Sequence, residues 1–148
     1  MTPVQHFSGR APGKINSTLW GSWVVSSEKI KVYFSGDGGY SGTFIALGDR
    51  YGPFDIAFVE GGAYNADWSE VHMFTNETVQ ASIDLKAKVL FPIHWSKFDL
   101  SIHPWDEPII HFSKEAGRRN VNISTPMISE VFDLTNLPKN PWWEALRN

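Results

Sequence analysis

Two short segments of the chain carry side chains that are suited to metal or hydrolytic chemistry. Asp37 lies in the glycine-rich residues 36–39 (GDGG), directly after an apolar run, and His94 closes the apolar run FPIH. The C-terminal ends of strands are where α/β sheets place their ligand sites. A carboxylate and an imidazole at such ends therefore predict a site near Asp37 and His94, although His94 alone is equally consistent with a core histidine that bonds to the backbone.

The glycine-rich segment around Asp37 allows three interpretations. A dinucleotide-binding loop needs the pattern G-x-G-x-x-G after a strand, but Ser41 occupies the third glycine position. A simple turn is the interpretation that the Asp-Gly pair favours locally. In the third interpretation the glycines allow the backbone to fold tightly around Asp37 and aim its carboxylate into a cleft.

The other histidines show no local metal motif. They are His6, His72, His103 and His111. None has H-x-H or H-E-x-x-H spacing, so spacing alone predicts no zinc site. His111 is expected on the surface of a helix or in a structural role, and His103 in a turn. The chain has no cysteine and no G-x-S-x-G motif, which excludes thiolate ligands, disulfides and a serine nucleophile elbow.

Strands alternate with helices along the chain. Periodicity and turn residues predict strands over residues 19–26, 29–35, 55–59, 88–93 and 121–124, and helices over 43–51, from an N-cap at Thr75, and over 104–119. The long segment 61–74 is predicted to be a loop. This order favours an α/β fold, and the initial hairpin favours a mixed β-sheet.

Length and composition indicate one globular domain over residues 1–148. Hydrophobic residues make up 42% of the 148 residues and charged residues 20%, with a net charge of -3. No basic cluster indicates nucleic-acid binding. No apolar run approaches the roughly 18 residues of a membrane span, and no apolar leader is present, so we expect a cytoplasmic protein that is not transmembrane.

Five groups of residues carry a family resemblance in their order and spacing over residues 1–112. They are 5–10 (QHFSGR) with 18–23 (TLWGSW), 33–40 (YFSGDGGY), 54–57 (FDIA) with 62–64 (GAY), 72–73 (HM) with 77–81 (ETVQA), and 93–95 (IHW) with Phe98 and 106–108 (DEP). Together they resemble the second half of metallo-β-lactamase-fold hydrolases similar to N-acyl-phosphatidylethanolamine-hydrolysing phospholipase D.

The resemblance implies a role for four residues. His6 aligns with a ligand of the first zinc ion, Asp37 with the carboxylate that bridges both ions, and His94 with a ligand of the second. His72 aligns with a histidine beside the substrate pocket, so Asp37 and His72 are the implied catalytic residues. Gly38 stands where the family has threonine, which removes a hydroxyl group but leaves the carboxylate.

The family's motif His-x-His-x-Asp-His does not occur in this sequence. The chain therefore resembles the C-terminal half of the αββα sandwich, a mixed sheet with helices on one face, without the N-terminal half that bears the motif. Each zinc ion would keep two ligands, one of them shared, where catalytic zinc usually holds three. We expect the isolated chain to be inactive as a hydrolase.

Half of a sandwich is expected to expose one apolar sheet face, which needs a partner. Candidates are the missing half, a second copy in a homo-oligomer, or the terminal segments with Trp142 and Trp143.

Three functions follow from the resemblance. They are a portion of a zinc-dependent phosphodiesterase-like or lactonase-like hydrolase with a small-molecule or lipid-like substrate, a non-catalytic binding or oligomerisation module derived from one, and an enzyme with a new site built from His6, Asp37 and His94.

Overall fold

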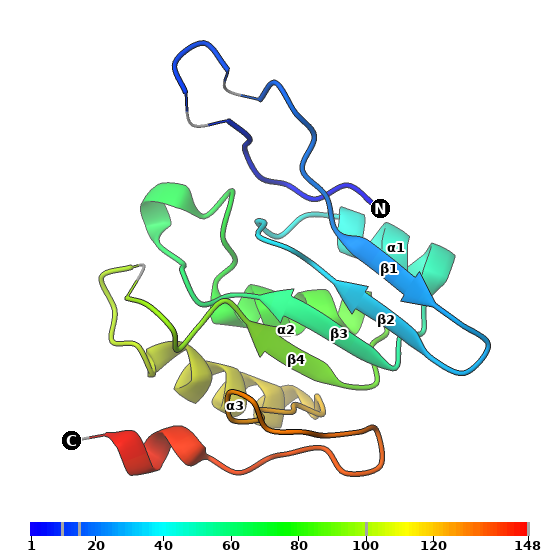
Figure 1. Ribbon diagram of the computed structural model, residues 1–148, viewed down its shortest axis with the longest axis vertical. Coiled ribbons are helices and arrows are strands. Elements are labelled where there is room, and N and C mark those ends of the chain that lie inside the picture. The colour runs from blue at the N-terminus through cyan, green and yellow to red at the C-terminus, as the bar shows by residue number, and fades with distance from the viewer. Residues whose placement is uncertain (10, 15, 100, 148) are drawn as a thin grey trace.

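A four-stranded mixed sheet with three helices organises the chain (Figure 1). The computed structural model describes residues 1–9, 11–14, 16–99 and 101–147. The elements in chain order are β1 (Trp23–Ser26), β2 (Lys31–Phe34), α1 (Thr43–Tyr51), β3 (Ile56–Glu60), the 3-10 helix η1 (Ala66–Trp68), α2 (Thr75–Asp84), β4 (Leu90–Ile93), α3 (Glu107–Arg119) and the 3-10 helix η2 (Trp142–Leu146).

The strand order β1-β2-β3-β4 follows the sequence. β1 and β2 form the predicted antiparallel hairpin, whereas β2, β3 and β4 run parallel. The C-terminal ends of these three parallel strands consequently meet at one edge of the sheet. The α/β class and the mixed sheet agree with the prediction.

One face of the sheet is covered by helices and fully buried. Tyr33, Ala57, Val59 and Leu90 point to this face and have no exposed surface. Figure 1 shows α1 and α2 on the same side of the sheet, with α3 beside α2. Their apolar side chains form one core with these strand residues, among them Phe112 of α3. The helix-covered face holds the three parallel strands rigidly in register.

The opposite face of the sheet, here called the open face, is apolar. Register and alternation place on it Trp23, Val25, Val32, Phe34, Ile56, Phe58, Phe91 and Ile93. Its outer part is uncovered, since Trp23 is 52% exposed, Val25 61% and Phe34 42%. An apolar row of this kind is characteristic of a surface that binds a partner.

The C-terminal tail packs at the far edge of the sheet and covers little of the open face. Trp143 is buried in the core, and Trp142 stacks on Trp95 with ring centroids 5.5 Å apart. Of the described tail residues, Phe132 reaches the open face, where its ring lies 5.4 Å from that of Phe91. The tryptophans therefore fasten the tail and leave β1 and β2 uncovered.

Several predicted boundaries are wrong. Residues 121–124 form no strand, because a single bridge from Ile123 to Leu90 is their only ladder contact among the described residues. Thr75 is the first residue of α2 and not its cap. The Glu77 side chain caps the start of the helix by accepting a hydrogen bond from the main-chain N–H of Phe74 at 2.9 Å.

No helix among the described residues is long and apolar enough to cross a membrane.

Candidate metal centre

Four side chains predicted to form a site line one pocket. His6, Asp37, His72 and His94 share a cavity of about 370 Å³ with Phe7, Ala63, Trp68 and Val71. The four come from four separate segments, at the ends of β2 and β4, in the loop after β3 and near the N-terminus. The fold thus brings together all four residues that the resemblance singled out.

A backbone bridge next to His6 positions this residue in the pocket. The N–H of Gly39 donates to the carbonyl of Gln5 at 2.8 Å, which pairs the N-terminal segment with the loop that carries Asp37. Nδ1 of His6 lies 2.7 Å from the carbonyl of Phe7. Because a carbonyl can only accept, Nδ1 carries the proton and Nε2 keeps a free lone pair. Arg10, in the same predicted block, lies outside the described residues.

Asp37 follows β2 through a tight turn. Gly36 has φ +62°, a left-handed conformation that glycine adopts at little cost. The side chain of Asp37 is 49% exposed and faces His94. This contact lowers the pKa of Asp37 below its ordinary value, against a smaller opposing effect of burial. The third interpretation of the glycine segment, a carboxylate aimed into a cleft, describes this geometry.

His94 leaves β4 in an unusual conformation. Its φ of +67° is uncommon for a residue with a side chain and turns the ring out of the strand's alternation. Nε2 lies 3.5 Å from Oδ1 of Asp37. The Asp37 carboxylate raises the pKa of His94, with burial acting in the opposite direction. Backbone strain of this kind is concentrated at functional sites.

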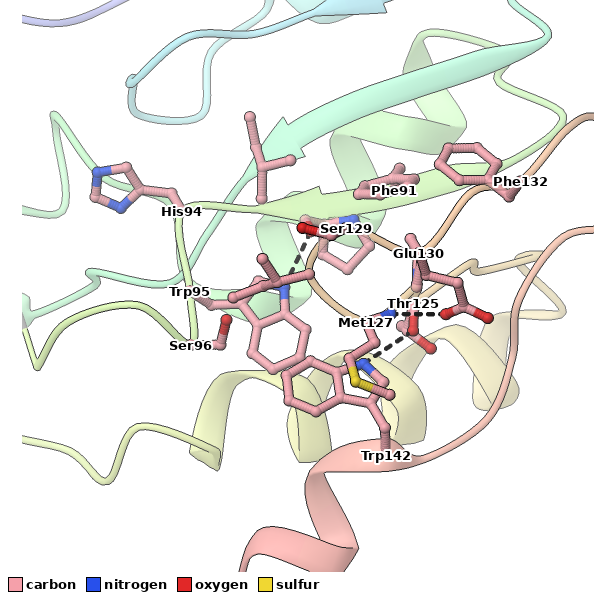
Figure 2. A pocket seen from close by; sticks show the side chains of 14 residues that line it. Phe91, His94, Trp95, Ser96, Thr125, Met127, Ser129, Glu130, Phe132 and Trp142 are labelled. Carbon is pink, nitrogen blue, oxygen red and sulfur yellow. Dashed lines mark hydrogen bonds between the residues drawn. The ribbon is translucent and has the colours of Figure 1, made fainter.

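The aromatic packing behind His94 fixes the backbone that carries it. Figure 2 shows the His94 ring pointing away from Trp95 and Trp142, which stack on each other. The indole N–H of Trp95 donates to the carbonyl of Pro92 at 3.0 Å, and that of Trp142 to the carbonyl of Thr125 at 3.1 Å. The tail thereby braces the turn after β4 on the side away from the cavity that His94 shares with Asp37.

Glu60 is a member of the site that the sequence did not reveal. It ends β3 with no exposed surface, and its Oε2 lies 3.3 Å from Nδ1 of His72. One ligand atom from each of Glu60, His72 and His94 lies within 4.8 Å of the others. The only signal for Glu60 in the sequence was its position at the end of the apolar run IAFVE. Asp37 and His94 also follow or close an apolar run.

The remaining two histidines lie outside the pocket. His103 stacks on Tyr64 with ring centroids 4.3 Å apart. His111 is exposed on α3, as predicted.

The donor set suits zinc, which binds imidazole nitrogen and carboxylate oxygen. The 3.5 Å between His94 Nε2 and Asp37 Oδ1 is long for a hydrogen bond. It is close to the distance of about 3.4 Å between two ligands of a tetrahedral zinc with bonds of about 2.0–2.1 Å. His94 and Asp37 therefore fit two ligands of one zinc ion in the type and spacing of their donor atoms. His6 adds a third side chain of a suitable donor type to the same pocket.

The sequence matches a family model. The model of the beta-lactamase superfamily domain covers residues 1–95, which include His6, Asp37, His72 and His94. The chain belongs to this superfamily. Within it, the chain has the metallo-β-lactamase fold and is a member of the metallo-β-lactamase-fold hydrolases, as the resemblance implied.

Curated relatives in the superfamily extend the match beyond residue 95. An uncharacterised protein of Mycobacterium tuberculosis is 37% identical over 145 residues, 95% of this chain and 39% of that protein. The outer membrane protein RomA of Klebsiella pneumoniae is 47% identical over 92 residues, 62% of this chain and 69% of RomA. N-acyl-phosphatidylethanolamine-hydrolysing phospholipase D 1 of Caenorhabditis elegans is 33% identical over 101 residues, 66% of this chain and 28% of that enzyme. The chain thus spans about two fifths of the mycobacterial relative.

Two solved structures share the fold of this chain at low identity. Igni18, a metallo hydrolase from Ignicoccus hospitalis, superposes with a TM-score of 0.66 at 20% identity over 89% of this chain and 52% of that one. The metallo-β-lactamase fold protein YhfI of Bacillus subtilis gives 0.53 at 18% identity over 69% of this chain and 39% of that one. The mixed sheet with helices on one face is therefore shared with these two structures.

Proposed function

We propose that this chain supplies half of the binuclear zinc centre of a metallo-β-lactamase-fold hydrolase. His6 would be a ligand of the first ion, His94 would be a ligand of the second, and the Asp37 carboxylate would serve both. The observation that carries the proposal is the convergence of these side chains in one pocket from separate segments. Residues that serve only the fold have no reason to present two imidazoles and a carboxylate to the same cavity.

Neighbouring residues of the chain orient the three proposed metal ligands. Phe7 orients His6, the turn at Gly36 presents the Asp37 carboxylate, and the tail braces the backbone of His94. His72 lies in the same pocket, with its ring centroid 5.5 Å from that of His6 and 5.2 Å from that of His94. From there it is placed to hold a substrate oxygen or exchange a proton with it. The bound ions would supply Lewis acidity and lower the pKa of water.

The chain alone is proposed to be an inactive hydrolase. It lacks the His-x-His-x-Asp-His motif, so two ligands remain for each ion, with Asp37 counted for both. We propose that a segment bearing that motif completes the site and covers the open face, building the second sheet of the αββα sandwich.

The substrate class is proposed from the relatives. The relative from Caenorhabditis elegans is named for hydrolysis of N-acyl-phosphatidylethanolamine, so a lipid-like molecule with a phosphodiester bond is the first choice. The fold by itself does not determine the substrate.

A second candidate function is a non-catalytic module that forms a homodimer. The observation that favours it is the uncovered part of the open face, with Trp23, Val25 and Phe34 exposed. A symmetric pairing of two such faces would bury them without adding metal ligands.

Zinc content and hydrolysis test the first candidate. The chain, purified without chelator, is expected to contain well below one zinc per chain and to leave bis(p-nitrophenyl) phosphate intact. Co-expression with a superfamily segment bearing the His-x-His-x-Asp-His motif is expected to restore both zinc and turnover. His94→Ala should abolish the restored turnover, and His111→Ala, on exposed α3, should retain it. Restored turnover that survives His94→Ala would refute the assignment.

A further inference from the structure

We propose that Glu60 is a positioning residue that holds His72 in the tautomer with the proton on Nδ1, which leaves the Nε2 lone pair for the pocket. This inference rests on the proposed function only in so far as that function gives His72 a role in the pocket. The tautomer itself follows from the contacts of Glu60.

The Glu60 carboxylate is held at several points. Oε1 accepts the main-chain N–H of Met73 at 2.7 Å. The main-chain N–H of Glu60 donates to Oγ of Ser35 at 3.0 Å, and its carbonyl accepts the hydroxyl of Thr78 at 2.8 Å. The residue is thus fixed between the end of β2 and the start of α2. With Oε1 on Met73, its second carboxylate oxygen, Oε2, lies toward His72.

A charge in this position needs donors, because Glu60 has no exposed surface. Among the described residues, the groups that bond its carboxylate are the Met73 N–H and His72 Nδ1, at 3.3 Å from Oε2. Burial raises the pKa of Glu60, and the contacts with His72 and with the Met73 N–H act in the opposite direction. Once ionised, the Glu60 carboxylate only accepts hydrogen bonds, so the proton in its contact with a neutral His72 lies on Nδ1. Without the His72 donor, the negative charge of the buried Glu60 carboxylate would keep only the Met73 N–H as a hydrogen-bond partner among the described residues.

The pocket receives the other ring nitrogen. Nδ1 and Nε2 lie on different edges of the imidazole, so a ring tied to Glu60 through Nδ1 presents an unprotonated Nε2 elsewhere. His72 lines the cavity with His6, Asp37 and His94. A lone pair at this point can accept a proton or bind a cation, and a protonated Nε2 can do neither.

The test is a direct reading of the tautomer. Long-range ¹H–¹⁵N spectra of the metal-free, ¹⁵N-labelled 148-residue chain at pH 8 distinguish the two neutral forms of each of its five histidines. The signal that disappears in His72→Gln identifies His72. We expect the Nδ1–H form in the wild-type chain, and the Nε2–H form there would overturn the proposal.

Glu60→Gln provides the second arm. The Met73 N–H needs an acceptor, so the new amide oxygen should stay on Met73 and its NH₂ group should face His72. That donor is expected to invert His72 to the Nε2–H form, and an unchanged tautomer in a folded variant would contradict the proposal. Glu77→Gln, at the start of α2, is the matched control and should leave His72 unchanged.

The two proposals fail separately. The tautomer needs neither zinc nor turnover, so loss of zinc binding would leave this result intact. Should Glu60→Gln unfold, as the backbone spectrum of the same sample would show, the wild-type tautomer still decides the matter.

Discussion

Nε2 of His94 lies 3.5 Å from Oδ1 of Asp37, although these residues follow two strands that are not neighbours in the sheet. β3 separates β2 from β4, and it ends in the buried Glu60. The contact across the sheet edge depends on the turn at Gly36 on one side and on the left-handed conformation of His94 on the other. It is the pairing on which the proposed zinc site is built.

Removing the Asp37 carboxylate is expected to lower the pKa of His94 in metal-free protein, because that carboxylate is the main cause of its raised value. The stabilisation from the raised His94 pKa is present below about pH 6.5 and lost as the pH rises through the folded value. The lowered Asp37 pKa describes the same ion pair, whose stabilisation is complete above about pH 3.9 and is lost as the pH falls through the folded Asp37 value. The pair therefore stabilises the chain only while Asp37 is ionised and His94 is protonated.

Asp37→Asn should therefore destabilise the chain at pH 5.5, by less than about 1 kcal/mol since Asp37 is half exposed. It should have no effect of this origin at pH 9. Urea unfolding at both pH values measures the difference. An equal loss at both would show that the pair contributes no pH-dependent stability.

A Cβ at Gly62 would overlap the main-chain carbonyl of His94. Gly62→Ala is expected to displace His94, destabilise the chain by about 1–3 kcal/mol and weaken zinc binding. Gly117→Ala is the matched control. A Cβ there meets nothing within 4 Å, so alanine in α3 should stabilise the chain by up to about 1 kcal/mol. Thermal unfolding of the two variants measures both changes in stability. A Gly62→Ala variant as stable as the Gly117→Ala variant would contradict the packing at His94.

The tail is expected to be part of the cooperative fold. Trp143 is 5% exposed, and Trp143→Ala should cost about 3–5 kcal/mol. Leu146→Ala, in the same 3-10 helix but 60% exposed, should change stability by less than about 0.5 kcal/mol. Denaturant unfolding of the two variants measures this, and a mild Trp143 variant would mean that the tail docks only weakly.

The open face is expected to drive self-association of the chain alone. Val25→Lys places a charge on this face, where Val25 is 61% exposed, and should shift the mass in solution toward the monomer. Val24→Lys points to the helix side of the same strand and should instead cost stability, about 2 kcal/mol, by burying a charge. Sedimentation velocity separates these outcomes, and a wild-type chain that is monomeric at high concentration would contradict the expectation.

Much of the fold was predictable because its signals are local. Helix α1 occupies the predicted residues 43–51, and the hairpin and the three parallel strands lie where apolar runs and turns placed them. Residues 121–124 show the limit of this method. Their apolar alternation is that of a strand, but packing beside β4 leaves a single bridge.

The site was predictable only in part. The resemblance picked out four residues that share a pocket, while spacing alone favoured a simple turn at Asp37. Glu60 escaped notice because its role depends on burial and on a loop that returns His72 to the end of β3. Neither can be read from the order of residues.

If His6, Asp37 and His94 form half of a zinc site, the ring signals of the chain's five histidines should report the binding of zinc. Zn²⁺ is titrated into the metal-free chain at pH 7.5 while the ring signals of all five are followed. We expect the signals of His6 and His94 to shift together and to saturate, and Asp37→Asn to weaken both responses. The signals of His103 and His111 should stay unchanged. Equal shifts at all five histidines, or none at His6 and His94, would contradict this assignment of the zinc ligands.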